Sequence, residues 1–165
     1  MSPQLQGVLV PHWLLMRDPR VEPFAAKRWV EARGDPDRFI EVSFEWITKN
    51  VSFCTDQNCF GQDEFVQMPA ETLTSGYGDC DCSALSLVSV LWLRGVPSHM
   101  VFGYVGNSSH RWVEAFYKHE WWVFDTTTGG RFLASQALKR GYEKLFEVTP
   151  FSVRPSFLPV PLPLP

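Results

Sequence analysis

The chain has 165 residues, of which 45% are hydrophobic, so it is long enough to bury one full-sized core and a single domain is expected. A net charge of −3 and an isoelectric point near 5.8 argue against a basic surface for nucleic acid or for an anionic membrane. No apolar run approaches the roughly 20 residues of a membrane helix, and the N-terminal stretch lacks the features of a signal peptide. We therefore expect a soluble protein, and the sequence assigns no compartment.

The first part of the sequence predicts irregular structure followed by two helices. Residues 1–22 contain three prolines and show no periodicity. A helix is predicted over 23–32, ended by Gly34. Asp35 caps a second helix, whose apolar stripe is formed by Phe39, Ile40, Phe44 and Ile47.

Three short segments connect this region to the centre of the chain. Residues 51–53 predict a short extended piece, and residues 54–67 are polar and predict a surface loop. Pro69 begins what looks like a single helical turn over 69–73.

The central prediction is a buried helix over 81–94. Nearly every position in it is apolar and its polar members are mainly serines, so most of its faces must be covered by other elements. Gly95 ends the helix and Pro97 prevents it from continuing.

The second half of the chain predicts mostly strands. Three strand-like runs cover 100–105, 110–117 and 121–126. A weak helix is predicted over 133–140 and a further strand over 143–153, interrupted by Pro150. The resulting organisation is an N-terminal extension over 1–35 with a possible helix, a catalytic domain over 36–154, and a proline-rich tail over 155–165. Such a tail favours an extended conformation and is a candidate contact for a partner.

Cys80 is the candidate nucleophile, because Gly78 and Asp79 place it at the start of the buried helix. Helix N-terminal N–H groups stabilise a thiolate, which predicts a lowered pKa for this thiol. The alternative is an inert buried cysteine, but the glycine-bearing approach is costly for packing alone. Cys82 is a rival nucleophile that we disfavour, because it lies two residues further into the helix.

His110 and Asp125 are the candidate base and its orienting carboxylate. Each lies on one of two consecutive predicted strands, so the turn between the strands decides whether they meet. A two-residue turn at 117–118 places His110 opposite Asp125, and one at 118–119 places Asp125 opposite Trp112, still on the face of His110. A three-residue turn would put them on opposite faces. Taken singly, His110 could be a surface histidine and Asp125 a turn carboxylate.

The remaining polar candidates carry weaker signals. A second donor to an oxyanion could come from Gln67 or from Tyr77. Two carboxylates are expected to be solvated or structural, namely Glu71 and Glu114. Three histidines show no partner pattern, namely His12, His99 and His119.

The four cysteines allow two further interpretations. Cys54 and Cys59 lie in one loop, where a disulfide between them is possible. Alternatively these two, together with Cys80 and Cys82, could bind zinc, although neither spacing is the usual one for a zinc knuckle. No metal and no cofactor is predicted.

Pro-Ala-Glu-Thr-Leu (69–73) resembles the segment before Gly-Asp-Cys in the microbial cysteine-peptidase-like members of the transglutaminase-like superfamily. Five further segments resemble the superfamily. They are Gly-Tyr-Gly-Asp-Cys-Asp-Cys-Ser-Ala-Leu (76–85), Leu-Arg-Gly-Val-Pro (93–97), Val-Phe-Gly-Tyr (101–104), His-Arg-Trp-Val-Glu (110–114) and Trp-Val-Phe-Asp-Thr-Thr (122–127). The resemblance implies an α+β, papain-like fold with the nucleophile at the start of a central helix packed on an antiparallel sheet. It also implies a triad of Cys80, His110 and Asp125. Cys82 departs from the pattern, since the family often has an acidic residue there.

The residues and the resemblance together predict a thiol acyl-transfer enzyme that acts on amide bonds of a peptide or protein substrate. Because the chain is small and shows no calcium-type acidic cluster, hydrolysis by a cysteine peptidase or amidase is favoured. One alternative is a protein-crosslinking transglutaminase. The other is a non-catalytic binding or structural protein that retains the fold.

Overall fold

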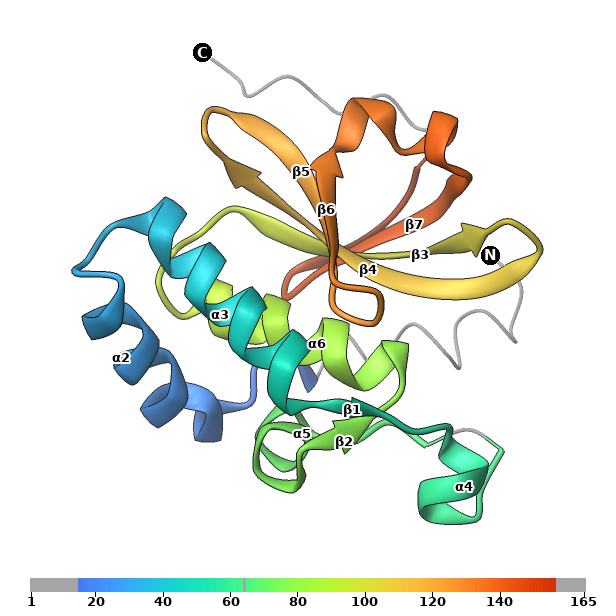
Figure 1. The fold of residues 1–165 in the computed structure, drawn as a ribbon, viewed down its shortest axis with the longest axis horizontal. Coiled ribbons are helices and arrows are strands. Elements are labelled where there is room, and N and C mark those ends of the chain that lie inside the picture. Colours follow the sequence, from blue (N-terminus) through green and yellow to red (C-terminus); the bar gives the residue numbers. More distant parts are fainter. Residues whose placement is uncertain (1–14, 64, 157–165) are drawn as a thin grey trace.

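A six-stranded antiparallel sheet packs against a central helix, α6 (Cys80–Trp92), in a computed structural model that describes residues 15–63 and 65–156 (Figure 1). The strand order is β6-β5-β4-β3-β7-β8. The strands are β3 (Ser98–Val105), β4 (Ser108–Tyr117), β5 (Glu120–Asp125), β6 (Gly130–Leu133), β7 (Tyr142–Thr149) and β8 (Ser152–Pro155). The α+β, papain/transglutaminase-like fold expected from the sequence is confirmed.

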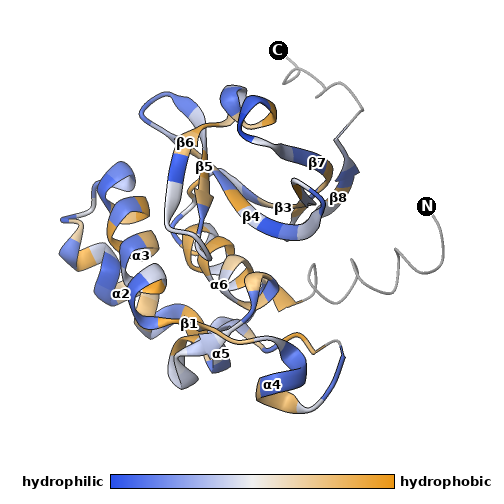
Figure 2. Cartoon of the chain, turned by 45° about the vertical axis from the view of Figure 1, so that its right-hand side comes forward, coloured by the Kyte–Doolittle hydropathy of each residue, from blue (hydrophilic) through white to orange (hydrophobic). Residues whose placement is uncertain are grey.

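Helices cover the side of α6 that faces away from the sheet. They are α2 (Glu22–Glu31), α3 (Pro36–Asn50) and α5 (Pro69–Ser75), and η1 (Pro19–Val21) packs against α2 and α5. In Figure 2 the hydrophobic residues of α6 and α3 lie on facing sides, while hydrophilic residues gather on the outer surfaces. The first helices begin close to where the sequence places them, and the side chain of Asp35 caps α3 by accepting the N–H of Arg38 at 2.7 Å.

Helix α6 is buried along most of its length, as predicted, and it starts one residue earlier and ends two residues earlier than 81–94. The hydroxyls of its buried serines donate hydrogen bonds to backbone carbonyls of the same helix. Ser86 donates to the carbonyl of Cys82 at 2.8 Å, and Ser89 donates to that of Leu85 at 2.7 Å. These bonds let polar residues sit in an apolar environment without an unsatisfied hydroxyl.

The sheet is apolar on both faces. One face packs on α6 with Met100, Phe102, Val113, Ala115, Phe124 and Val148. The other carries a smaller cluster of Val101, Trp112, Val123, Phe132, Ala137 and Tyr142. The pairing of β3 with β7 has a bulge next to Gly103. The Trp112 ring and the Glu143 carbonyl approach Gly103 so closely that a Cβ at this position would lie 2.6 Å from the ring and still closer to the carbonyl.

The turn between β4 and β5 consists of two residues, Lys118 and His119, since Tyr117 pairs with Glu120. Both turn residues have positive φ, as a tight hairpin of this hand requires. This is the second of the two registers that the sequence allowed. This register places His110 and Asp125 on the same face of the sheet. The turn forms although it contains no glycine, the residue that most readily adopts positive φ.

Residues 51–78 hold more structure than the sequence indicated. The extended piece predicted over 51–53 is strand β1 (Ser52–Phe53). Its parallel pairing with β2 (Tyr77–Gly78) was not predicted. The predicted surface loop contains a short helix, α4 (Asp56–Phe60), so the loop expectation is wrong over those residues. The disulfide left open by the sequence is present between Cys54 and Cys59, and it closes the segment around α4.

The last described segment also differs in detail. The predicted weak helix is two 3-10 helices, η2 (Ala134–Gln136) and η3 (Leu138–Arg140), preceded by the unpredicted β6. The predicted strand over 143–153 is a hairpin of β7 and β8, turned at Pro150 and Phe151. Residues 157–165 of the proline-rich tail lie outside the described residues. In the part of the chain that the structure describes, no helix combines the length and apolarity of a membrane span.

Candidate active site

Cys80 is the first residue of α6 and is partly exposed, as expected for a nucleophile at a helix start. The side chain of Asp79 fixes this end of the helix by accepting the N–H of Cys82 at 3.0 Å. The thiol of Cys80 lies 3.8 Å from a carboxylate oxygen of Asp81. The backbone N–H of Arg111 also acts on this thiol, so Cys80 faces β4 at the residue that follows His110.

The electrostatics of the thiol differ from the sequence prediction. Burial raises the pKa of Cys80 above its usual range, and the carboxylates of Asp81 and Asp79 raise it further. The positive charge and backbone N–H of Arg111 act in the opposite direction but do not overcome them. The predicted lowering of the pKa is therefore wrong, because burial of the sulfur, together with the two carboxylates, outweighs the helix N-terminus.

Cys82 is fully buried and faces the carbonyl of Phe65 at 4.0 Å. Burial and the charge of Asp79 raise the pKa of Cys82 to about 12. A Cβ on Gly78 would lie 2.6 Å from the Cβ of Cys82, so the glycine before the nucleophile is needed to let this side chain pack. These contacts fit a packing role for Cys82.

His110 and Asp125 come together as the sequence proposed. The Nε2 atom of His110, on β4, lies 2.9 Å from Oδ2 of Asp125, the last residue of β5. The other ring nitrogen, Nδ1, is not used in this contact. Among the described residues, the hydrogen bonds of His110 do not include one to Cys80.

Asp125 is completely buried and is held by four donors. Besides His110, its carboxylate accepts the N–H groups of Thr127 and Thr128 at 3.0 and 3.2 Å and the hydroxyl of Tyr142 at 2.7 Å. Burial alone would raise the pKa of Asp125, but the hydrogen bond and charge of His110, with Tyr142, hold it below its usual value. Asp125 is thus an ionised anchor for the imidazole.

Sequence reasoning missed two residues of this site. Tyr142 comes from β7, and no motif connected it with Asp125. Arg111 follows His110 directly, and its Nε lies 3.1 Å from Asp81 while its guanidinium covers the Phe102 ring at 4.3 Å. The only available signal was the position of Arg111 beside the histidine.

Neither residue suggested as a second oxyanion donor is shown in that role. Gln67 is buried, and its side-chain oxygen accepts the hydroxyl of Thr72 at 3.1 Å. Tyr77 lies exposed on β2. Glu71, expected to be solvated or structural, has a capping role in which its carboxylate accepts the N–H of Met68 at 3.2 Å.

The zinc interpretation is contradicted, because Cys54 and Cys59 are bonded to each other. Within the described ranges, two groups bring possible metal ligands together: Asp79 with Cys80 and Asp81, and His99 with Glu114 and Glu147. The first is an acidic pair next to the nucleophile that the sequence prediction did not anticipate.

The other histidines differ in their positions and contacts. His119 is a turn residue, as expected, and His12 lies outside the described residues. His99 does have partners, since its Nε2 lies 3.2 Å from Glu114. Glu114 is 2% exposed, so it is a structural carboxylate and not a solvated one.

Solved structures with a similar fold come from several bacteria. Legionella pneumophila LapG, EGTA-treated, matches with a TM-score of 0.60 and 17% identity, over 72% of this chain and 66% of that chain. Calcium-bound LapG matches with a TM-score of 0.59 and 16% identity, over 85% and 92%. A candidate cysteine protease from Cytophaga hutchinsonii matches with a TM-score of 0.56 and 19% identity, over 87% and 48%, so this chain spans about half of it.

At these identities the likeness shows the fold alone. The comparison with curated proteins gave no match. The family model of the transglutaminase-like superfamily matches residues 23–126, a segment that includes Cys80, His110 and Asp125. The chain belongs to the transglutaminase-like superfamily.

Proposed function

We propose that the protein is a thiol acyl-transfer enzyme that hydrolyses amide bonds of a peptide or protein. The observation that carries the proposal is the His110–Asp125 contact of 2.9 Å, presented by β4 next to the start of α6, where Cys80 lies. A buried carboxylate that fixes one ring nitrogen leaves the other nitrogen for a nucleophile. A structural role alone gives no reason for this arrangement beside a partly exposed thiol.

The proposed reaction begins with proton transfer from the Cys80 thiol to Nδ1 of His110. The sulfur then attacks the amide carbon, and the carbonyl π electrons move to the oxygen. The N–H of Cys80, in the first turn of α6, is one candidate donor to that oxygen, because helix N-terminal N–H groups lack intrahelical acceptors.

Collapse of this intermediate breaks the C–N bond, and His110 gives its proton to the leaving amine. Water then attacks the thioester carbon while His110 accepts a proton from it. Collapse of the second intermediate releases the acid, and the proton returns to the sulfur. Asp125 stays ionised and stabilises the imidazolium in both halves of the reaction. The raised pKa of Cys80 makes His110 essential, because the thiol does not ionise unaided near neutral pH.

The test is a screen of a quenched-fluorescent peptide library with wild type and four variants. Cys80→Ala and His110→Ala are expected to lose at least about 1,000-fold in kcat/KM, and Asp125→Asn somewhat less. Cys82→Ala is the matched control, because it removes a neighbouring thiol that lies buried in the packing. Full activity of Cys80→Ala on a responsive substrate would refute the proposal.

Two further arms separate related possibilities. An added primary amine distinguishes crosslinking from hydrolysis, since a transglutaminase would join the amine to the acyl group. Calcium and EGTA are also compared, because LapG was solved in both conditions. Asp79 and Asp81 offer oxygen ligands of the kind calcium prefers, although Arg111 already lies 3.1 Å from Asp81 and Asp79 already caps α6.

A further inference from the structure

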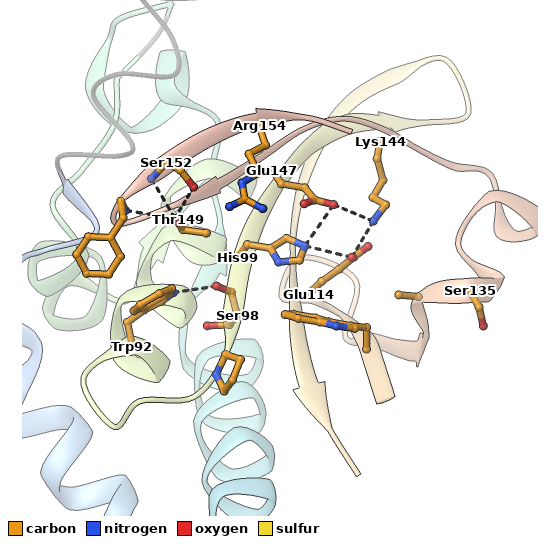
Figure 3. A pocket seen from close by; sticks show the side chains of 14 residues that line it. Trp92, Ser98, His99, Glu114, Ser135, Lys144, Glu147, Thr149, Ser152 and Arg154 are labelled. Carbon is orange, nitrogen blue, oxygen red and sulfur yellow. Dashed lines mark hydrogen bonds and ion pairs between the residues drawn. The ribbon is translucent and has the colours of Figure 1, made fainter. Parts of the chain in front are cut away.

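A cavity of about 660 Å³ opens at the end of the sheet where α6 stops (Figure 3). Trp92, the last residue of α6, lines it, whereas Cys80 is the first. Twelve steps of about 1.5 Å along the helix separate these residues by roughly 18 Å. The cavity is therefore a site apart from the proposed catalytic centre, and its size is that of a small-molecule site.

One wall of this cavity is a cluster of hydrogen-bonded charged side chains. Oε2 of Glu114 lies 2.9 Å from Nζ of Lys144 and 3.2 Å from Nε2 of His99. Glu147 completes the cluster through its own contact of 3.2 Å with Lys144. Burial would raise the pKa of Glu114, but the hydrogen bond from His99 and the charge of Lys144 hold it below its usual range. Both carboxylates thus contact the single ammonium of Lys144.

This pairing argues against a metal or an organic cation as the occupant. The ammonium of Lys144 lies within 3.2 Å of the same two carboxylate oxygens that could ligate a metal, so it fills the cation position. A second cation would have to displace a partner that the cluster already holds.

Arg154 differs from the cluster beside it. It extends from β8, where it pairs across the strands with Glu147, and it lines the same cavity. Figure 3 draws no interaction from its guanidinium to the neighbouring residues, and within the described part of the chain it has no hydrogen-bond or ion-pair partner. Among the described residues of this wall, Arg154 is therefore the cation whose guanidinium makes no hydrogen bond or ion pair, and a guanidinium is suited to bidentate binding of a carboxylate.

The rest of the wall is aromatic. The indole N–H of Trp92 is used by the carbonyl of Ser98 at 2.8 Å, so its ring presents apolar surface. Trp121 is 40% exposed and Phe151 is 68% exposed. Exposed aromatic faces next to an unpaired guanidinium suit a ligand with an apolar body and one anionic group.

We propose that this cavity binds a carboxylate carrying an aromatic or branched apolar group, with Arg154 holding the carboxylate and Trp121 and Phe151 contacting the apolar part. Two sources share this chemistry: a free organic acid and the C-terminal residue of a peptide. Binding here does not depend on the reaction proposed for Cys80.

The test is calorimetric titration with 3-phenylpropionate and with 3-phenylpropanol, its neutral counterpart, neither of which contains an amide. The acid is expected to bind at least about tenfold more tightly than the alcohol, the factor expected for one charge-assisted contact. Arg154→Gln should remove that preference, while Arg131→Gln, an exposed arginine on β6, should keep it. Equal binding of acid and alcohol, no effect of Arg154→Gln, or no binding at ~10 mM acid would overturn the proposal.

A second titration separates the two sources. Gly-Gly-Phe and its C-terminal amide are compared on the Cys80→Ala variant, so that no hydrolysis consumes them. Preference for the peptide acid assigns the site to peptide C-termini. If phenylpropionate binds and the two peptides do not differ, the site takes free acids. Because both titrations measure binding alone, they can fail while the catalytic proposal stands, and the reverse also holds.

Discussion

The hydroxyl of Tyr142 donates a hydrogen bond of 2.7 Å to Oδ2 of Asp125, the same oxygen that lies 2.9 Å from His110 Nε2. Tyr142 is itself packed between the rings of Trp112 and Phe132, at centroid distances of 5.2 and 5.1 Å. The packing of these rings therefore fixes the position of the phenol relative to the carboxylate. In the proposed mechanism, Tyr142 is therefore expected to act as a positioning residue, holding the carboxylate that contacts the imidazole of His110.

Tyr142→Phe should lower kcat/KM by about tenfold, because a hydrogen bond to a charged group contributes roughly 1.5–3 kcal/mol. It should also reduce the free energy of unfolding at pH 7 by about 2 kcal/mol. Tyr142 helps to lower the pKa of Asp125, so the stability it supplies is present above the unfolded-state pKa and is lost as pH falls through the folded-state value. The stability difference between wild type and variant should accordingly narrow below about pH 4.

Urea unfolding at several pH values and initial rates on the library substrate measure these effects. Tyr104→Phe is the control, because Tyr104 lies on β3 with 41% of its side chain exposed. Unchanged activity and stability in Tyr142→Phe would show that the phenol does not position Asp125.

Glu114→Gln should lower the free energy of unfolding at pH 7 by about 2 kcal/mol, because it removes the buried charge that pairs with Lys144. The pKa of Glu114 is lowered in the folded state, so its stabilising effect is present above the unfolded-state pKa and is lost on acidification. The cost of the substitution should therefore shrink below about pH 4. Glu143→Gln, at an exposed position on β7 next to Lys144, is the control. A cost that does not change with pH would contradict an ionised Glu114.

The sequence could not have predicted this buried carboxylate. Its partners His99 and Lys144 lie on β3 and β7, which pair with each other although about 40 residues separate them in the chain. Nothing local in the sequence indicates that β7 pairs with β3, so Glu114 looked like one more polar strand residue. Tyr142 was missed for the same reason. By contrast, the His110–Asp125 contact depends on one hairpin, and counting residues across it limited the possibilities to a few registers.

Asp79→Asn should shift the alkylation of Cys80 to lower pH. The Asp79 carboxylate raises the pKa of this thiol, and asparagine keeps the oxygen that caps α6 while removing the charge. Burial, with the charge of Asp81, raises the pKa of Asp79 itself to about 6. The native state therefore binds an extra proton between the usual value of 3.8 and 6, and wild-type stability should fall as pH rises through that window.

Iodoacetamide rates from pH 6 to 10 and urea unfolding at pH 4 and 7 measure both effects. In Asp79→Asn the stability loss between these two pH values should be smaller than in wild type. Asp63→Asn, at an exposed position, should behave as wild type. A thiol titration that does not move in Asp79→Asn would argue against a contribution of this carboxylate to the Cys80 environment.

Replacing both Cys54 and Cys59 by serine should destabilise the protein by about 2 kcal/mol, the estimate from chain entropy for so short a loop. The effect should be greatest in α4, where hydrogen exchange of residues 56–60 should accelerate more than that of α6. If the exchange rates of residues 56–60 were the same in wild type and in the double variant, the disulfide would not stabilise this segment.

The segment at the N-terminus of α6 was the most predictable part of the candidate site, because the effects of its glycine, aspartate and cysteine depend on residues close to them in the sequence. Gly78 makes room for Cys82, and Asp79 caps the helix that Cys80 begins. The pKa of the thiol was not predictable in the same way. It depends on how deeply the sulfur is buried and on how Arg111 and Asp81 pair, and both follow from the packing of β4 on α6.

The most direct test of the catalytic assignment is the rate at which iodoacetamide modifies each free cysteine at pH 7, followed by peptide mass spectrometry. We expect Cys80 to react at least about tenfold faster than Cys82, and His110→Ala to lower the Cys80 rate by a similar factor, because the thiol needs the imidazole to lose its proton. Equal rates at the two cysteines, or a Cys80 rate that His110→Ala leaves unchanged, would contradict the account.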